Sequence, residues 1–234
     1  MKGQTETIRA EGLRFDRYMT IYKNTTKVKV VTVLFNDNSV PEEWGIWDVT
    51  QTIVRHTPEN DYQNISVYFP IENQDDIWFG SMGNVPDRQE VVPGIEQVNY
   101  SPVNGKIFAS VSDGWVCFVD ERDEQTYAKI FDIVEDAEYP DDGGIVQLYT
   151  NGSAKYMEVE VTGPLETIGS NGDSIIFTEY WYAGRSNGPI YAANHAGIVR
   201  EPLNYSRSSR LVTGGYASFN EGQFKIAFFY TIVN

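Results

Sequence analysis

Two glutamates, Glu158 and Glu160, lie two residues apart in the run YMEVEVTGPL, among the apolar residues Met157, Val159 and Val161. This alternation is typical of a β-strand, in which every second side chain points to the same face. The two carboxylates are therefore expected on one face. If that face is solvated, the pair has no special role. If it lines a pocket, the carboxylates could take protons or accept hydrogen bonds from a ligand.

The chain has two histidines, His56 and His195, which are the residues suited to act as an acid opposite such a carboxylate. His195 lies in AANHAGI, a run of small residues, and is the candidate catalytic acid. A loop position without catalytic function is the alternative for each. Nucleophilic catalysis finds no support, because there is no G-x-S-x-G motif and Cys117 lies in the apolar run WVCFV.

The aromatic residues, with five tryptophans and 15 tyrosines, exceed what packing needs. Sugar rings stack on aromatic faces while their polar edges form hydrogen bonds, so a carbohydrate is the ligand that this composition suggests. Trp78, in ENQDDIWFGSMG, is the first candidate for a ligand-facing aromatic residue. Core packing explains Trp115 and is the alternative for Trp47.

The elements that must position these groups are strands, because alternation with a period of two dominates the chain and helical periodicity is scarce. Asn-Gly or Asp-Gly pairs at 104–105, 113–114, 151–152 and 171–172 indicate tight turns. The expected strands cover Leu13–Tyr22, Thr25–Asn36, Trp44–Ile53, Ile65–Phe69, Lys106–Val111, Trp115–Val119, Thr126–Ile133, Gly144–Thr150, Lys155–Thr162, Ser174–Tyr182, Arg210–Ser218 and Gln223–Ile232.

Two long stretches, Ile71–Gln97 and Gly184–Ser209, are polar and contain glycine and proline, so they are expected to be loops over one rim. The chain shows no tandem repeat and no low-complexity tract. The prediction is an all-β protein, a large antiparallel β-sandwich that forms a single domain over residues 1–234, since sandwiches of this size often fold as one unit.

The formal charge of −15 over 234 residues opposes binding to phosphate backbones and anionic membranes, so neither nucleic acid nor a membrane is an expected partner. A single cysteine excludes an internal disulfide and a thiolate zinc cluster. The first residues lack the apolar core of a signal peptide, and no apolar run approaches membrane-spanning length. A cytoplasmic protein and a secreted one whose leader has been removed both stay open.

Acidic clusters at 72–76, 120–124 and 139–144 have the oxygen ligands that calcium takes from mobile loops. None has the spacing of an EF-hand loop. Solvated turns are therefore the default for these clusters, and no cofactor is expected.

The run GIVQLYTNG followed by YMEVEVTGPL resembles the QxYT strand and the later glutamate-bearing strand of aldose 1-epimerases, the galactose mutarotase-like supersandwich. The segment VLFNDNSVPEEWGIWDVTQ is similar to the place in that superfamily where an Asn-containing strand leads into a tryptophan-rich one. YPDDGG, EVTGPL and GDSIIFTEYWY resemble a poorly characterised bacterial branch. The likeness covers about Gly12 to Tyr182. It implies a supersandwich here, one in which early N-terminal strands of typical members are missing.

The resemblance implies a glutamate that acts as base toward the anomeric hydroxyl of a sugar and a histidine that acts as acid toward the ring oxygen. Glu160 matches that glutamate by its distance to the Gly-Pro pair, and Glu158 is second. Gln147 and Tyr149 fall on the QxYT strand and are expected to contact the sugar. Where the epimerases carry an Asn-His pair, this chain has Trp44 to Trp47, so an unmodified mutarotase mechanism is not expected.

Three hypotheses follow. The first is a carbohydrate-binding β-sandwich that recognises a sugar through Trp, Tyr and carboxylate groups, and the missing acid favours it. The second is a sugar-active enzyme of aldose 1-epimerase type with Glu160 as general base, which the aligned carboxylates keep open. The third is a subunit-interaction module without catalytic activity, expected to form a homodimer through exposed strand edges. Anionic uronates are poorer ligands unless arginines such as Arg185 gather at the groove.

Overall fold

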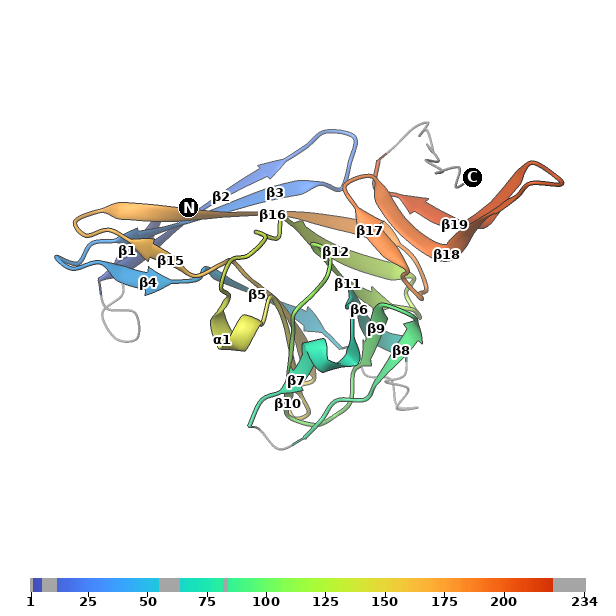
Figure 1. Ribbon diagram of the computed structural model, residues 1–234, viewed down its shortest axis with the longest axis horizontal. Helices are drawn as coiled ribbons and strands as arrows, with labels where there is room; N and C mark the ends of the chain where they lie inside the picture. The colour runs from blue at the N-terminus through green and yellow to red at the C-terminus, as the bar shows by residue number, and fades with distance from the viewer. Residues whose placement is uncertain (1, 6–11, 55–63, 82–83, 221–234) are drawn as a thin grey trace.

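The computed structural model describes residues 2–5, 12–54, 64–81 and 84–220 (Figure 1). Strands dominate these residues, and every pair of neighbouring strands is antiparallel. The helical segments are a 3-10 helix, η2 (Gln74–Asp76), and the short α1 (Pro140–Gly143). No helix in the described ranges is long and apolar enough to cross a membrane. The predicted all-β, antiparallel sandwich is confirmed.

A nine-stranded sheet forms one layer of the sandwich. In spatial order its strands are β1 (Lys2–Thr5), β2 (Leu13–Ile21), β3 (Val28–Asn36), β16 (Asp173–Arg185), β12 (Gln125–Phe131), β11 (Trp115–Asp120), β6 (Ile65–Pro70), β9 (Ile95–Asn99) and β8 (Arg88–Val92). The long strand β16 lies beside β3 and β12 and so joins the N-terminal strands to the rest of the sheet.

A five-stranded sheet forms the facing layer and carries the glutamate pair. Its order is β5 (Trp47–Ile53), β14 (Tyr156–Thr162), β13 (Val146–Asn151), β10 (Gly105–Ala109) and β7 (Ile77–Phe79). A two-stranded sheet adds β15 (Glu166–Ile168) and β4 (Glu42–Trp44).

The main hydrophobic core lies between the two large sheets. Phe118 of β11 and Val159 and Val161 of β14 are among its buried members. Fully burying a side chain of this kind stabilises the fold by roughly 1.5–3 kcal/mol relative to leaving it in water. Because these residues of β14 fill the core, the alternate residues Glu158 and Glu160 face the opposite side of the five-stranded sheet.

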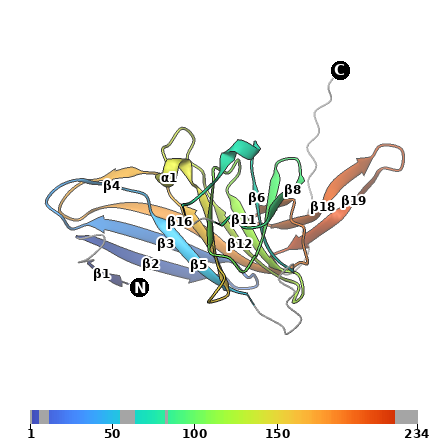
Figure 2. The ribbon, with the colours of Figure 1, turned by 90° about the horizontal axis from the view of Figure 1, so that it is seen from below.

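A second, smaller core covers the other face of the nine-stranded sheet. There a three-stranded sheet packs against the nine-stranded sheet. Its strands are β17 (Ala192–Asn194), β18 (Gly197–Ser206) and β19 (Leu211–Ser218). Cys117 and Val119 contribute to this core together with Ile198 and Phe219. Strand β11 is thus buried on both faces, which explains its continuous apolar run. The β18–β19 hairpin projects beyond the sandwich, as both ribbon views show (Figure 2).

Two segments that the sequence predicted as loops contain strands, so that prediction was wrong. The first holds β7, β8 and most of β9, and the second holds β17 and β18. Polar residues occur in these strands because they have partners on neighbouring strands. Glu96 of β9 is fully buried and forms an ion pair of 2.8 Å with Arg88 of the edge strand β8. The expected strand at Gln223–Ile232 lies outside the described residues.

Candidate functional site

A hollow of about 450 Å³ lies on the face of the five-stranded sheet that is turned away from the main core. Two cross-strand rows build it. In one, Gln147 of β13 pairs with Glu160 of β14 and Phe108 of β10, and in the other Tyr149 pairs with Glu158 and Lys106. The residues that line the hollow are Trp47, Gly80, Ser81, Lys106, Phe108, Asp141, Gln147, Tyr149 and Glu158.

The turn between β13 and β14 sets the register of these rows. The side-chain oxygen of Asn151 accepts hydrogen bonds from the backbone nitrogens of Ser153 (3.0 Å) and Ala154 (2.7 Å). Lys155 closes the turn with φ of 56°, in the left-handed region. A slip of one residue would turn both glutamates into the core, so the turn and the apolar pattern of β14 specify the same register.

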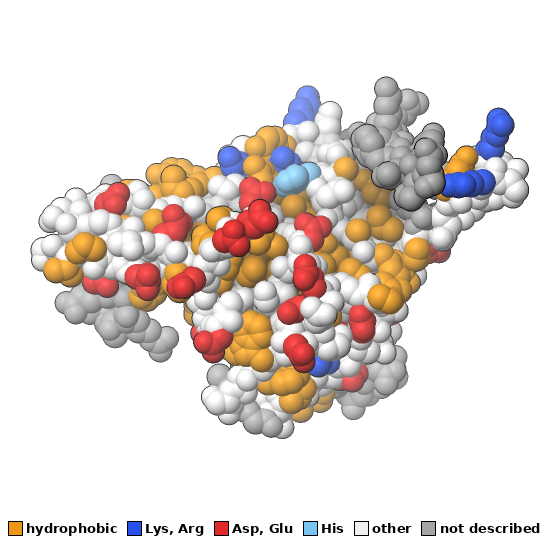
Figure 3. Space-filling model, viewed as in Figure 1, with side chains coloured by type: hydrophobic (Ala, Val, Ile, Leu, Met, Phe, Trp, Pro, Cys, Tyr) orange, Lys and Arg blue, Asp and Glu red, His pale blue; other side chains and the backbone are white. Residues whose placement is uncertain are grey.

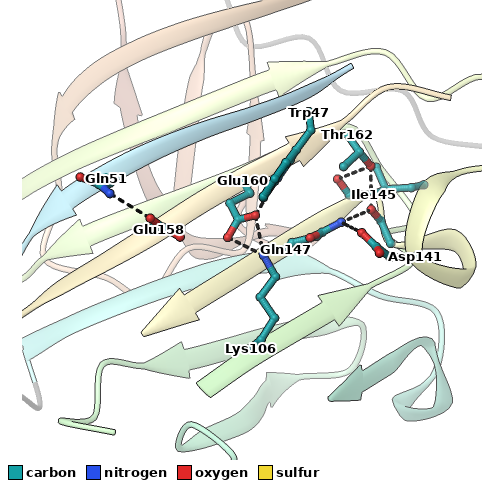
Figure 4. A network of polar contacts seen from close by, with 10 residues as sticks. Trp47, Gln51, Lys106, Asp141, Ile145, Gln147, Glu158, Glu160 and Thr162 are labelled. Atoms are coloured by element: carbon teal, nitrogen blue, oxygen red, sulfur yellow. Dashed lines mark hydrogen bonds and ion pairs between the residues drawn. The ribbon is translucent and has the colours of Figure 1, made fainter. Parts of the chain in front are cut away.

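Glu160 is fully buried, and both of its oxygens accept hydrogen bonds from residues that line the hollow (Figure 4). Trp47 Nε1 donates to Oε2 at 2.7 Å, and Lys106 Nζ lies 2.6 Å from Oε1 and 2.5 Å from Oε2. Burial raises the pKa of Glu160 above its ordinary value, although the Lys106 charge and the two donors act in the opposite direction. The predicted shared face of the two glutamates is therefore observed, but Glu158 lines the hollow and Glu160 lies behind two of its lining residues.

Of the aromatic residues that line the hollow, Trp47 is the most open to a ligand, since it is 52% exposed while its ring nitrogen is held by Glu160. Lys106 Nζ lies 5.3 Å from the centre of the Trp47 ring and 5.5 Å from that of Phe108, within the range of cation–π attraction. Core packing therefore does not explain Trp47. It does explain Trp115, which is 2% exposed.

Trp78 lies beside the hollow without lining it. It belongs to strand β7 and not to a loop, and its ring stacks on Phe108 with centroids 6.0 Å apart and an interplanar angle of 10°. Phe108 in turn lines the hollow. Trp78 thus packs beside Phe108 on the same face of the sheet.

The rim of the hollow carries two carboxylates, each of which accepts a hydrogen bond from a neutral amide. Gln147 Nε2 donates to Asp141 Oδ2 at 2.7 Å, and Gln51 Nε2 donates to Glu158 Oε1 at 2.9 Å. Asp141 reaches this position because α1 packs closely against Gly45, where an added Cβ would lie 2.6 Å from Pro140. A glycine ahead of β5 therefore brings the YPDDGG turn to the site.

His195 and Arg185 are not part of this site. His195 Nδ1 is 2.9 Å from the hydroxyl of Tyr182, which belongs to the smaller core on the far face of the nine-stranded sheet. Burial and the charge of Lys27 lower the pKa of His195. Arg185 lines a different hollow, beside Phe219. His56 lies outside the described residues, so within the described ranges the site holds no histidine.

A second polar cluster lies on the other face of β5, one residue along from Trp47. Asp48 there accepts a hydrogen bond from the fully buried Lys129 (2.5 Å) and another from Arg17 (2.6 Å). Burial opposes ionisation of Asp48, but the charges of Lys129 and Arg17 outweigh it and lower its pKa.

Glu179 completes this second cluster. It is 1% exposed, neither carboxylate oxygen has a hydrogen-bond partner, and Lys129 Nζ is 3.7 Å away. Burial raises the pKa of Glu179 to about 7, although the Lys129 charge acts against the shift. Tyr127, whose hydroxyl lies 3.4 Å from Thr50 Oγ1, borders the same cluster. This site is closed, with its carboxylates inside the sandwich.

The acidic clusters considered for calcium form capping and rim contacts. Asp76 accepts backbone hydrogen bonds that cap η2, from Glu72 at 3.2 Å and from Asn73 at 2.7 Å. Among the described residues, no group of three or more His, Cys, Asp or Glu side chains is arranged to hold a metal ion.

Sequence reasoning missed five lining residues, which are Gly80, Ser81, Lys106, Phe108 and Asp141. Lys106 is 54 residues from Glu160 in the chain and becomes its partner only through the pairing of β10 with β13. A signal did exist for Asp141, because YPDDGG directly precedes the QLYT strand. For Lys106 and Phe108 the signal was the alternation of β10, which shows that they share a face but not which strands lie beside it.

Comparison with known proteins shows which solved structures have a similar fold. No family model matches the sequence, and no curated protein is significantly similar to it. Among solved structures, a galactose mutarotase-like protein from Lactobacillus casei is similar with a TM-score of 0.52 and 10% identity, over 78% of this chain and 68% of that one. A TPR-domain containing protein from Parabacteroides distasonis has a TM-score of 0.51 and 11% identity, over 81% of this chain and 32% of that one.

A putative aldose 1-epimerase from Klebsiella pneumoniae is also similar, with a TM-score of 0.47 and 10% identity, over 75% of this chain and 48% of that one. The chain thus spans less than two thirds of the length of the Parabacteroides and Klebsiella proteins. At this level of identity the likeness concerns the fold alone. The chain has the galactose mutarotase-like fold that the sequence resemblance implied.

Proposed function

We propose that the hollow on the five-stranded sheet binds a carbohydrate. The observation that carries the proposal is a half-exposed tryptophan ring fixed beside hydrogen-bonding side chains in one hollow of about 450 Å³. That volume falls within the range of small-molecule sites, roughly 300–1,000 Å³. A galactose mutarotase-like fold, whose members include proteins described as aldose 1-epimerases, adds support of a general kind.

The Trp47 ring supplies the flat surface on which the apolar face of a sugar stacks. Its position is held by the hydrogen bond from its ring nitrogen to Glu160. Because this bond already restrains the ring, the ring loses little conformational freedom when a ligand covers it. Covering its apolar face also removes that face from water, which is favourable. Glu160 acts in this proposal as a positioning residue.

The edges of the sugar meet the polar rim. Tyr149 and Glu158 lie in one cross-strand row of the rim. Gln147, in the other row, donates a hydrogen bond to Asp141. Hydroxyl groups of a sugar both donate and accept, so a rim with carboxylates, an amide and a phenol can satisfy them. The ammonium of Lys106 has three N–H donors. Glu160 accepts hydrogen bonds from it on the side that faces the sheet.

The test is the affinity of the protein for the methyl glycosides of glucose and galactose, measured by calorimetry. Trp47→Ala should weaken binding about tenfold, which corresponds to about 1.4 kcal/mol. Tyr18→Ala is the matched control, because Tyr18 is 54% exposed and belongs to β2 in the other sheet. Equal effects of the two substitutions, or no binding of either glycoside, would overturn the proposal.

A sugar-active enzyme of aldose 1-epimerase type is the second candidate. It is favoured by the raised pKa of Glu160 and by the ammonium of Lys106 at hydrogen-bond distance, which together form a proton acceptor and a proton donor. For Glu160 to reach a sugar, Trp47 and Lys106 must first move aside. Exchange between the α and β anomers of glucose, followed by NMR, separates the candidates. An enzyme accelerates the exchange and Glu160→Gln abolishes the acceleration, whereas a binding protein leaves the exchange rate unchanged.

A further inference from the structure

The charges around the hollow are unequal, and their balance bears on the class of sugar that fits. Lys106 is the cation that lines it, and the contacts of 2.5 Å and 2.6 Å to Glu160 locally cancel both charges. Two lining carboxylates, Glu158 and Asp141, are left. Each has a neutral amide as its hydrogen-bond partner, from Gln51 and Gln147, and neither forms an ion pair with a Lys or Arg of the described residues.

The two uncancelled carboxylates flank the Lys106–Glu160 pair, with Glu158 on one side and Asp141 on the other (Figure 4). A sugar ring stacked on Trp47 would therefore have a negative group near each end. Acidic side chains are also frequent on the face of the protein in Figure 3, in line with the formal charge of −15. The local and the overall field have the same sign.

We propose that the hollow selects amino sugars, with a protonated amino group held by Asp141 or Glu158, over neutral sugars, and neutral sugars over uronates and sugar phosphates. The inference rests on the proposed carbohydrate function of the same hollow. An ammonium group donates charge-assisted hydrogen bonds to carboxylates, which are about twice as strong as neutral ones. A carboxylate or phosphate on the sugar would instead face two like charges.

An anionic sugar could gain an uncancelled positive charge only by drawing Lys106 away from Glu160. That movement would leave Glu160, which is fully buried, without its counter-charge. Losing that counter-charge is unfavourable, so the ion pair resists this rearrangement. The lysine at the site thus does not make it an anion site.

The test compares the affinities of four methyl glycosides at pH 6, carrying the glucosamine, N-acetylglucosamine, glucose and glucuronate rings, and repeats them in the galactose series. We expect the amino sugar to bind three- to tenfold more tightly than the neutral sugar, and the uronate at least threefold more weakly. N-acetylglucosamine controls for bulk at the same carbon without the charge. The advantage of the amino sugar should shrink in 0.5 M salt, because the two carboxylates are near solvent.

Asp141→Asn and Glu158→Gln should each reduce the preference for the amino sugar over the neutral one by about threefold. Asp142→Asn is the matched control, since Asp142 has a similar backbone conformation (φ of 62° against 55°) and exposure but lines a neighbouring hollow. Uronate binding equal to or tighter than that of the neutral sugar would overturn the inference and leave the carbohydrate function standing. If no glycoside of either series binds, the proposed function itself fails.

Discussion

Two polar clusters lie on opposite faces of β5 and are reached from adjacent residues, Trp47 and Asp48. On the Trp47 side, the buried carboxylate of Glu160 accepts from two donors and a hollow opens above them. On the Asp48 side, Lys129 and Glu179 lie inside the sandwich, and the oxygens of Glu179 have no hydrogen-bond partner. One cluster is satisfied and open to a ligand, and the other is closed and holds a carboxylate whose pKa is raised by burial.

The difference shows that a perturbed carboxylate pKa does not by itself mark a site that a ligand can reach. Glu179 has the larger perturbation, yet it is 1% exposed and does not line the hollow beside Trp47. Structural ion-pair networks also shift pKa values. What distinguishes the Glu160 side is the exposed ring and the polar rim. The two clusters should therefore respond differently to substitution, one mainly in stability and the other mainly in binding.

The largest expected effect is on stability, from Lys129→Met. Removing the buried ammonium leaves Asp48 and Glu179 without their shared cation, and we expect the free energy of unfolding in urea to fall by about 3–5 kcal/mol. Lys106→Met should cost only about 1–2 kcal/mol, because Glu160 keeps its bond from Trp47 and water can enter the hollow.

Glu179→Gln in the Lys129→Met background provides the control for this first prediction, and it should recover part of the loss. Equal losses from the two lysine substitutions would show that the clusters do not differ in the way described.

The second effect is the pH dependence of stability caused by Glu179. Its pKa is raised from 4.5 to about 7 in the folded state, so between these values the folded protein holds a proton that the unfolded chain releases. Stability should therefore decrease as pH rises from about 4.5 to about 7, by on the order of 3 kcal/mol. Asp48 has the opposite sign: its lowered pKa stabilises the fold above about 3.8, and this contribution is lost as pH falls.

Urea unfolding measured at half-unit steps of pH checks this dependence. Glu179→Gln should remove most of the decrease between pH 4.5 and 7, with the raised pKa of Glu160 accounting for part of the remainder, while Glu158→Gln, on the open side, should leave the decrease in place. An unchanged slope in Glu179→Gln would assign the effect to another group.

The smallest expected effect concerns Trp47 and Asp48, the adjacent residues on opposite faces of β5. Trp47→Phe keeps a ring but loses the hydrogen bond to Glu160, so the affinity for a methyl glycoside should fall about threefold and the unfolding free energy by about 1 kcal/mol. Calorimetry and urea unfolding of the same samples measure both. Asp48→Asn, on the closed side, should leave the affinity within about twofold of the original. A larger loss of affinity in Asp48→Asn would show that the two faces of β5 are coupled.

Alternation of apolar and polar residues was enough to predict the antiparallel strands and the common face of Glu158 and Glu160, because it is a local property of an extended chain. It failed where polar residues are buried in strands, as in β9, where Glu96 is satisfied by Arg88 of the adjacent strand. The sequence also identified Trp47, Gln147 and Tyr149, which do line the hollow. It could not exclude His195, whose distance from the glutamates depends on which sheet covers which.

By itself the sequence determined the all-β class, the strands with clear alternation and which of their side chains share a face. Only the tertiary structure decided that Lys106 meets Glu160, that Asp141 comes to the rim beside Gln147, and that Glu179 is left inside. The physical reason is that a local pattern fixes the direction of a side chain relative to its own strand. The partner of that side chain depends on strand order, and strand order is set by how the whole chain buries its apolar surface.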